Sequence, residues 1–499
     1  MRILRSRETR LFLIAWLLYA VHFATNVVRE HYPAFSIVDH GTFRVDEYQG
    51  FHADIFVHRD GHSVIGNQVF VSLLAAIPLF VFDPALDAIE AYSKAKLARE
   101  GVQNAEYRIE DKPNRVRFFQ LVKERGLDLR FGAATFVTTA FFMAPITAAF
   151  LVFFYRVLRR RGATPDDATV LTFLLGFGTP VFFRTSTLNH NLFVMYAMFS
   201  AFVLLWPRSG DEAVSARRRA LAGCFGGVTL ATDYVGVIIL PLRWFYFMFS
   251  RRRSASWVTA FRESLVIVAG SIPPILFLLY SQWAMYGNPF LPGQAWMPNQ
   301  NQYVEQGMRG FTLPDPELFV MGLFDPSFGM YTWGPILLLA LLPARRLEAQ
   351  SLVLPMFERR WLAVTILVFM LFASMNQYSR LQFNSGFRYL VPLVPFLMLA
   401  IADHWRRIPS RLRWAIAIVA ILHSWVLVVF REPVVQSWRM FIDEGVQLPW
   451  YRVLTLTSDP ASPWIGAWWI PAGILTVTLL IALAIWRSGA RMEDDRAVS

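Results

Sequence analysis

The sequence predicts an all-α polytopic membrane protein. Hydrophobic residues occupy 55% of its 499 positions, and apolar runs recur from one end of the chain to the other. Many of these runs approach or exceed the ~20 residues that a helix needs to cross a bilayer. Arginines cluster at the ends of alternate runs, as the positive-inside rule expects of cytoplasmic loops. We therefore expect one membrane domain over residues 1–499, built as a bundle of about twelve transmembrane helices.

The net charge of +12 could by itself indicate a nucleic-acid partner. The position of the basic residues argues against this, because they gather at the ends of spans as a topology signal would. We expect no nucleic-acid partner. The single cysteine, Cys224, lies inside an apolar run, so no disulfide framework can form within the chain.

The first apolar run follows a basic N-terminus. No small-residue cleavage site precedes Arg29, so we interpret this run as an uncleaved span. The tightest connection between two runs is at Asp233. The expected spans are residues 11–28, 131–156, 168–184, 191–207, 218–232, 234–250, 263–284, 331–344, 361–376, 389–404, 413–430 and 466–486. Both termini are then cytoplasmic, together with the basic clusters at residues 156–161, 217–219, 251–253, 345–346 and 406–413.

One apolar run, residues 69–82, does not fit as a span. It has 14 residues, and Pro78 interrupts it. If it crossed the membrane, the topology would invert and residues 156–161 would lie outside. We therefore expect an interfacial helix on the outer surface. Residues 84–130 then form a solvated insertion, with a helix around residues 85–97.

Four outer segments follow from this topology: residues 29–130, 285–330, 376–388 and 431–465. The first is the first outer, periplasmic loop, with its interfacial helices. The second is polar, aromatic and rich in proline, which makes it a candidate lid. The fourth is a further outer loop.

The first outer segment gathers the side chains that move protons and bind metals. Five of the nine histidines and six carboxylates lie between residues 29 and 68. They are His31, His40, His52, His58, His62, Glu30, Asp39, Asp46, Glu47, Asp54 and Asp60. Ionisable groups concentrated beside a membrane span predict that the chemistry takes place there.

Short motifs follow one another in a set order along the chain. They are Glu30-His31-Tyr32-Pro33-Ala34, Asp39-His40-Gly41-Thr42-Phe43, Asp60-Gly61-His62, the segment from Ser186 to His190, Tyr286-Gly287-Asn288-Pro289-Phe290, Phe328-Gly329-Met330-Tyr331, and Gly386-Phe387-Arg388-Tyr389-Leu390-Val391-Pro392. With the layout of the spans, they resemble the GT-C superfamily of membrane glycosyltransferases. That superfamily includes protein O-mannosyltransferases and the transferase that adds aminoarabinose to lipid A.

The resemblance implies a GT-C-like bundle with a defined reaction. A sugar passes from a polyprenyl-phosphate donor to a hydroxyl of a glycan, lipid or protein acceptor, with inversion at the anomeric carbon. The site faces the exterior of a bacterial inner membrane. The aminoarabinose transferases have an Asp-Glu pair where this chain has Arg29-Glu30, and Asn67-Gln68 stand where a further acid is expected. We therefore assign no metal ligand, and a divalent metal remains only one option.

Three acids are candidates for the base that accepts the acceptor's proton. Glu30 is the first choice, because it follows the first span at the outer interface. Asp46 is the rival, because its neighbour Glu47 can raise its pKa. Asp54 follows His52 by two residues and is the third. The alternative for Glu30 is an interfacial acid that merely pairs with Arg29. The alternative for the acids of the loop is that they are simply solvated.

Six residues are candidates for substrate binding. Arginine suits a leaving phosphate because it donates in a bidentate fashion. The six are Arg388, Arg380, Tyr378, His190, Asp233 and His62. An interfacial arginine can also snorkel without function, and Asp233 fits a tight outer turn equally well. His58 and His62 have the i,i+4 spacing of a helical metal pair, but Asp60-Gly61 between them favours a turn.

Two other functions stay open. A transporter or flippase for a lipid-linked sugar would show buried charges within several spans or inverted repeats. A non-catalytic assembly protein could share the same fold, and Arg29 in place of an acid keeps this reading open.

Overall fold

The computed structural model describes residues 6–102, 113–207, 213–298, 302–303, 305–343, 353–381, 388–457 and 468–497. Within these ranges the chain is mainly helical, and the one sheet described is a two-stranded antiparallel hairpin of β1 (Ile55–Val57) and β2 (Ser63–Ile65). The all-α class is therefore confirmed. Five helices are long and apolar enough to cross a membrane: Phe70–Glu100, Asp128–Arg160, Trp257–Tyr286, Ser410–Phe430 and Trp469–Ser488. That these helices span the membrane, and the expected number of about twelve spans, stay predictions.

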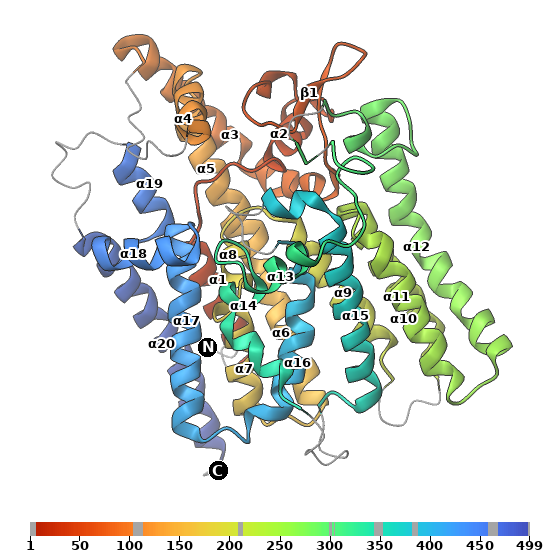
Figure 1. Ribbon diagram of the computed structural model, residues 1–499. Helices are drawn as coiled ribbons and strands as arrows, with labels where there is room; N and C mark the ends of the chain where they lie inside the picture. The colour runs from red at the N-terminus through yellow and green to blue at the C-terminus, as the bar shows by residue number, and fades with distance from the viewer. Residues whose placement is uncertain are drawn as a thin grey trace.

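The bundle is built from helices that coincide with most of the expected spans (Figure 1). They are α1 (Arg7–Val21), α5 (Asp128–Thr138) continuing through a π-helical turn (Thr139–Met143) into α6 (Ala144–Arg160), α7 (Pro165–Phe177), α8 (Val181–Thr185), α9 (His190–Leu205), α10 (Ala216–Thr232), α11 (Gly236–Arg252), α12 (Trp257–Tyr286), α15 (Met356–Met375), α16 (Val394–Trp405), α17 (Ser410–Phe430) and α20 (Trp469–Ala497). Side-chain caps begin several of them. Asn189 accepts a hydrogen bond from the backbone N–H of Leu192 at α9, and Ser256 accepts one from Thr259 at α12.

The expected span at residues 331–344 is not one continuous α-helix. It consists of α14 (Met330–Trp333) followed by a 3₁₀ segment (Pro335–Leu341). Pro335 has no backbone N–H, and Gly334 has φ −141°, so the α-helical ladder stops between them. The basic pair at residues 345–346 lies outside the described residues.

The expected break at Pro78 is wrong. α3 (Phe70–Glu100) is one helix of 31 residues that runs through Pro78 and Pro84. The separate helices expected at residues 69–82 and 85–97 are therefore parts of a single element. A helix interior tolerates proline at the cost of a backbone hydrogen bond, and here α2 (His31–His40) and α5 pack against α3. α3 is also among the five helices long enough to span.

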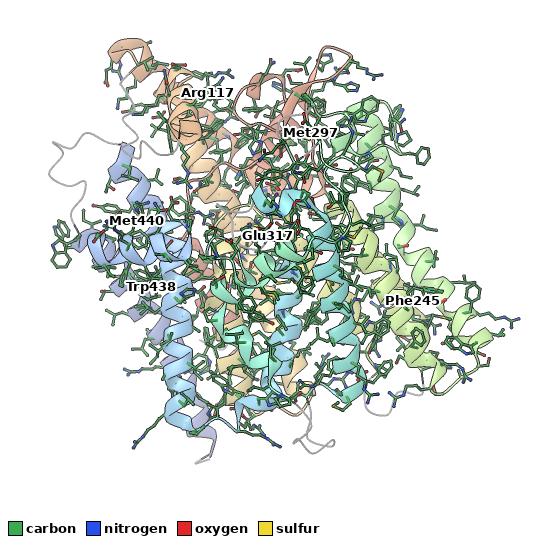
Figure 2. All side chains as sticks on the ribbon, viewed as in Figure 1. Arg117, Phe245, Met297, Glu317, Trp438 and Met440 are labelled. Carbon is green, nitrogen blue, oxygen red and sulfur yellow. The ribbon has the colours of Figure 1, made fainter. Side chains whose placement is uncertain are left out.

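The expected outer segments share one end of the bundle. Figure 1 shows α2, α3, β1 and α4 (Pro113–Glu124) together at the upper end. The candidate lid lies beside the β-hairpin: the hydroxyl of Tyr286 donates to the carbonyl of Ile65 (2.6 Å), and Figure 2 shows Met297 at this end. Of the other outer elements, α19 (Pro449–Thr457) lies towards the upper end, and α13 (Pro316–Phe324) and α18 (Val434–Glu444) lie near mid-height (Figure 1). Parts of all four segments fall outside the described residues: 103–112, 299–301, 304, 382–387 and 458–465.

Ion pairs join the helices at the opposite end. Asp167, at the start of α7, accepts from Arg406 (2.6 Å) and lies 3.5 Å from Arg413. Glu263 of α12 pairs with Arg219 (2.8 Å) and Arg251 (3.0 Å). The arginines that predicted the cytoplasmic loops therefore also hold neighbouring helices together.

Small residues allow α10 and α12 to touch along their backbones. A Cβ atom added to Gly223 would lie 1.9 Å from the carbonyl oxygen of Ile267, and one added to Gly270 would lie 2.1 Å from that of Ala220. Gly223 and Gly227 have the small-xxx-small spacing that brings membrane helices close together.

Candidate functional site

A buried charged network lies at the upper end of the bundle, where the chain leaves α1. Nδ1 of His190 donates a hydrogen bond to the carboxylate of Glu30, and its Nε2 lies 3.1 Å from Oδ2 of Asp233. Glu30 lies directly before α2, His190 is the first residue of α9, and Asp233 lies in the turn between α10 and α11. Three elements distant in the sequence therefore meet through one imidazole ring.

Arg29 joins this network to a further acid. Its Nε donates to Glu30 (3.3 Å), its Nη1 donates to Asp54 (3.1 Å), and its Nη2 lies 3.3 Å from Nε2 of His190. Burial alone would raise the pKa of Glu30, but His190 and Arg29 hold that pKa below its ordinary value. Arg29 thus contributes positive charge to two acids at once, Glu30 and Asp54.

Asp54 is the more accessible of the two acids that Arg29 contacts. Its side chain is 24% exposed, whereas that of Glu30 is 4% exposed. The backbone N–H of Asp54 donates to Nδ1 of His52 (3.0 Å), which fixes the loop before β1. Burial would raise the pKa of Asp54, but His52, Arg29 and Arg388 together hold it below its ordinary value. A carboxylate is therefore presented at the surface of an otherwise enclosed network.

A cluster of arginines, which we call the basic cluster, lies beside Asp54 and consists of Arg184, Arg388 and Arg431. Arg388 interacts electrostatically with Asp54, and Arg184 interacts with both other arginines and with Glu30. Arg431 donates to the hydroxyl of Ser186 (2.6 Å), and its guanidinium lies 4.1 Å from the ring centre of Phe183. Arg184 is only 4% exposed.

Several cations lie close together here: Arg184 lies near Arg388 and Arg431, and Arg115 acts on Arg431. Burial, together with Arg115, lowers the pKa of Arg431 to about 9, and Glu432 opposes this only in part. Glu432 is itself engaged by Arg115 (3.0 Å). Because arginine stays protonated in proteins, the lowered pKa reflects the cost of burying this guanidinium beside another cation rather than a neutral side chain. Such a site suits an anionic ligand.

Of the predicted site residues, the network brings together Glu30, Asp54, His190, Asp233 and Arg388. Tyr378 belongs with them, because burial and then the charge of Asp54 raise the pKa of its hydroxyl.

Asp46 and His62 form a separate pair. Oδ2 of Asp46 lies 3.0 Å from Nδ1 of His62, and the two side chains are 48% and 41% exposed. The backbone N–H of Ser63 also donates to Asp46, and these contacts outweigh burial to lower the pKa of Asp46. No described contact joins this pair to Arg29 or Asp54.

Arg380 is occupied elsewhere. It donates to Asp315 and Glu317 (2.8 Å each), which ties its loop to the start of α13. His58 and His62 are joined across a turn by a backbone hydrogen bond of 2.8 Å, so they do not share a helix face. Among the described residues, no group of three or more histidine, cysteine or acidic side chains is arranged to hold a metal ion.

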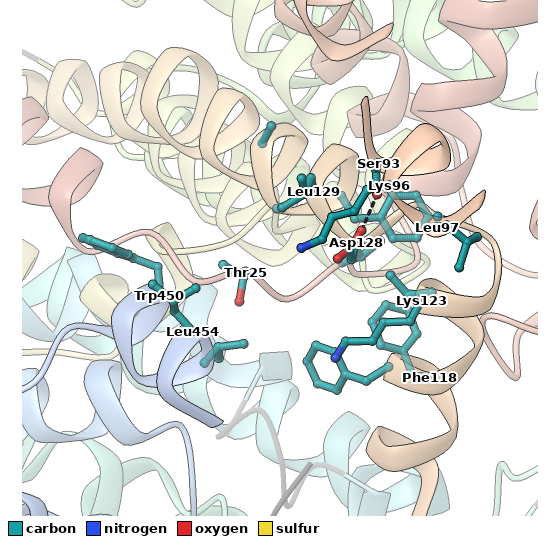
Figure 3. A pocket seen from close by; sticks show the side chains of 18 of the residues that line it. Thr25, Ser93, Lys96, Leu97, Phe118, Lys123, Asp128, Leu129, Trp450 and Leu454 are labelled. Atoms are coloured by element: carbon teal, nitrogen blue, oxygen red, sulfur yellow. Dashed lines mark hydrogen bonds between the residues drawn. The ribbon is translucent and has the colours of Figure 1, made fainter. Parts of the chain in front are cut away.

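A mainly apolar groove of about 600 Å³ lies next to the network (Figure 3). Its walls come from α3, α4, α5, α19 and the segment between α1 and Arg29. Phe23, Thr25 and Val27 face this groove, whereas the backbone N–H of the intervening Ala24 donates to the carbonyl of Ser186 (2.8 Å). The same serine contacts Arg431, so this short segment separates the groove from the basic cluster.

Figure 3 shows the ammonium groups of Lys96 and Lys123 directed into this groove, with Trp450 and Leu454 on the opposite wall. Asp128 accepts a hydrogen bond from the hydroxyl of Ser93 (2.6 Å) at the rim. The groove therefore combines apolar walls with a few polar groups.

Sequence reasoning missed Arg29, Arg184 and Arg431 as site residues. Arg29 and Arg431 directly follow an expected span at its outer end, and Arg184 is the last residue of one. Arg388 directly precedes an expected span, also at its outer end. Most other arginines lie at the inner ends of the spans. An arginine at an outer end opposes the positive-inside rule, and this signal could have identified all four. Comparisons with protein-family models, with curated proteins and with solved structures find no match to this chain.

Proposed function

We propose that the chain is a glycosyltransferase that moves a sugar from a polyprenyl-phosphate donor to an acceptor hydroxyl. One observation carries the proposal: a partly exposed carboxylate, Asp54, lies beside Arg29 and Arg388 at one end of an apolar helix bundle. A hydroxyl nucleophile needs a base, and a lipid phosphate that leaves needs cations. The order of the GT-C-like motifs supports the same reaction, and the acceptor is a glycan, a lipid or a protein.

Asp54 is the better base than Glu30 in this arrangement. The carboxylate of Glu30 is engaged by both His190 and Arg29 and is almost fully buried. Within the described part of the chain, Asp54 pairs at hydrogen-bond distance with Arg29, and it has exposed surface that an acceptor hydroxyl can reach. Glu30, His190 and Asp233 then position Arg29, and Arg29 positions Asp54.

The basic cluster provides for the leaving group. The acceptor oxygen forms a bond to the anomeric carbon while its proton passes to Asp54. The bond between the anomeric carbon and the phosphate oxygen breaks, and its electron pair leaves with the lipid phosphate. Arg388, Arg184 and Arg431 are placed to stabilise this anion. A single displacement of this kind inverts the anomeric configuration.

The groove beside Phe23 is suited to hold part of the isoprenoid chain. Its walls are mainly apolar, and the segment that lines it leads within two residues from Val27 to Arg29. The site would face the exterior of a bacterial inner membrane, with both termini in the cytoplasm, because the arginine-rich ends of the helices lie at the opposite end of the bundle.

The test is sugar transfer by the purified chain in nanodiscs, with several radiolabelled polyprenyl-phosphate sugars as donors. Asp54→Asn should lower the transfer rate by at least ~100-fold, the lower end of what a general base contributes. Asp46→Asn is the matched control, because Asp46 is an acid of the same segment outside the network, and it should retain wild-type transfer. Equal rates for wild type and Asp54→Asn would remove Asp54 from the mechanism.

One observation favours a flippase as the second candidate. Arg243, in the middle of α11, is 2% exposed and lies between the rings of Phe202 (5.4 Å) and Phe396 (5.1 Å). A charge inside a span often marks a transport path. Movement of labelled lipid-linked sugar between leaflets, without transfer, would support this alternative. Neither transfer nor movement with any donor would leave a non-catalytic assembly role.

A further inference from the structure

α18 is amphipathic and packs on α17 by one face. The hydroxyl of Ser437 is fully buried and donates to the carbonyl of Glu432 (2.8 Å), and the ring of Phe441 contacts Trp425 of α17 (5.7 Å). The opposite surface of α18 is therefore left uncovered by the described part of the chain.

The uncovered surface carries one apolar and one polar stripe. Val435, Trp438 and Ile442 follow at i, i+3 and i+7; Val435 and Ile442 are 72% and 77% exposed, whereas Trp438, at the edge of the stripe, packs partly against α17. Gln436, Arg439 and Asp443 repeat the same spacing one position later. Residues at these spacings share one face of a helix, so the two stripes lie side by side.

Trp438 shows which way the apolar stripe points. Its indole N–H donates to Nδ1 of His423 (3.0 Å), and His423 lies seven residues, about 10 Å at 1.5 Å per residue, below the end of α17. Figure 2 agrees: Trp438 is on the lower side of α18, towards the middle of the bundle, and Met440 is on the upper side. The stripe of Val435 and Ile442 therefore turns towards the level of the spans.

The length of α17 sets the level of α18. α17 has 21 residues, which span about 31 Å, close to the thickness of the hydrocarbon core of a bilayer. Its outward side is apolar, with Ile418 and Val419 each 63% exposed. Figure 1 shows α18 crosswise at the upper end of this helix. α18 thus lies where the hydrocarbon core ends.

We infer that α18 is an interfacial helix that binds the outer leaflet of the lipid bilayer. Val435 and Ile442 enter the acyl-chain boundary, and Arg439 and Asp443 (side chains 84% and 65% exposed) stay among headgroups and water. The same lipid that covers α17 covers α18. This inference is independent of the proposed sugar transfer, because it concerns a surface away from Asp54.

The inference has a consequence for the basic cluster. Arg431 lies three residues before the start of α18, in the left-handed conformation (φ 56°) that ends α17. An α18 held at the interface therefore holds Arg431 at the depth of lipid headgroup phosphates.

The test uses spin labels on single cysteines. Because Cys224 is the single cysteine of the chain, Cys224→Ala gives a clean background. Val435→Cys and Ile442→Cys report on the apolar stripe, Gln436→Cys and Asp443→Cys are the matched polar controls, and Ile418→Cys is the lipid-facing reference. Each labelled full-length variant is placed in phosphatidylcholine–phosphatidylglycerol vesicles, and collisions with oxygen and with a water-soluble nickel chelate are measured.

Labels at 435 and 442 should collide several-fold more with oxygen than with the nickel chelate, as the label at 418 does. Labels at 436 and 443 should show the reverse ratio. Two outcomes overturn the inference: nickel collisions at 435 and 442 equal to those at 436 and 443, which place the stripe in water, or protection from both reagents, which means that a protein covers it. A variant that fails to fold is recognised by a changed ratio at 418 in a doubly labelled sample.

Discussion

His190 is the residue on which the buried network depends. It stands between Glu30 and Asp233, and its side chain is only 9% exposed. Removing one partner of a buried charged pair leaves the other without compensation, at a cost of roughly 3–5 kcal/mol. An imidazole between two ionised acids is therefore worth more to the fold than an exposed ion pair.

His190→Ala should lower the free energy of unfolding by roughly 3–5 kcal/mol. His62→Ala is the control, because its partner Asp46 is half exposed, and exposed pairs contribute at most about 1 kcal/mol. Denaturant titration of both variants in the same detergent measures the difference. Equal losses for the two variants would contradict a structural role for His190.

The acids of the network also fix a pH dependence. The folded-state pKa values of Glu30 and Asp54 lie below the ordinary 4.5 and 3.8. Their ion pairs therefore stabilise the fold fully above those ordinary values, and this contribution is lost only as the pH falls through the lower folded values. A base that is already ionised in the neutral range does not cause the transfer rate to fall as the pH is lowered within that range.

The rate of sugar transfer by the wild type should therefore not decrease as the pH is lowered from 7 to 5. The rate of transfer at saturating donor, measured across this range, checks the expectation. A decrease with its midpoint near pH 6 would show that a neutral carboxyl group or a histidine, rather than ionised Asp54, acts as the base.

Glu30, His190 and Asp233 could each be predicted from the sequence, but their contact could not. Glu30 and Asp233 lie 160 and 43 residues from His190, so only the packing of α1, α9, α10 and α11 brings them together. Arg29 was predicted only as a departure from an acidic motif. Its role as the cation between Glu30 and Asp54 depends on where the loop before β1 lies.

At the scale of the elements, α3 shows the limit of local patterns. Pro78 predicts a break from the sequence, because proline removes a hydrogen bond. Contacts with α2 and α5 outweigh this local preference, and the helix continues to Glu100. The helices whose ends carry polar caps and arginines were predicted more closely, because those signals are local.

The close packing of α10 against α12 depends on glycines, which have no side chain, at the contact between the two helices. Gly223→Val should destabilise the fold by roughly 1–3 kcal/mol or more, because a Cβ at 223 meets the backbone carbonyl of Ile267. Gly226→Val is the control on the same helix, since a Cβ there meets only the side chain of Leu240 at 3.4 Å. Thermal unfolding in detergent measures both. Similar melting temperatures for the two variants would mean that the backbones do not touch.

At the scale of the whole molecule, the ends of the bundle differ in charge and in chemistry. One end carries the ion pairs of Asp167 and Glu263 with arginines, and the other carries the network around Arg29. The all-α class and the division into two ends could be predicted from apolar runs and arginine positions. The number of complete spans could not, because several helices are shorter than a bilayer and rely on their neighbours.

Reporter fusions test the orientation of this bundle. A fluorescent-protein fusion after Arg253 should fluoresce in the cytoplasm, and an alkaline phosphatase fusion after Asn288 should be active outside, because α12 separates the two points. The exchanged fusions serve as controls and should be silent. Activity of the phosphatase after Arg253 would reverse the orientation and place the network of Arg29 inside the cell.

The hydrogen bonds of His190 also set an order for biogenesis. During synthesis, Arg29 and Glu30 leave the ribosome 160 residues before His190, and Asp233 follows 43 residues later. Until α9 and the turn after α10 have been made, the first acid of the network has only Arg29 and Asp54 as its companions. The network therefore closes only once Asp233 has followed His190, and a nascent chain that stops before α9 leaves Glu30 without its imidazole partner.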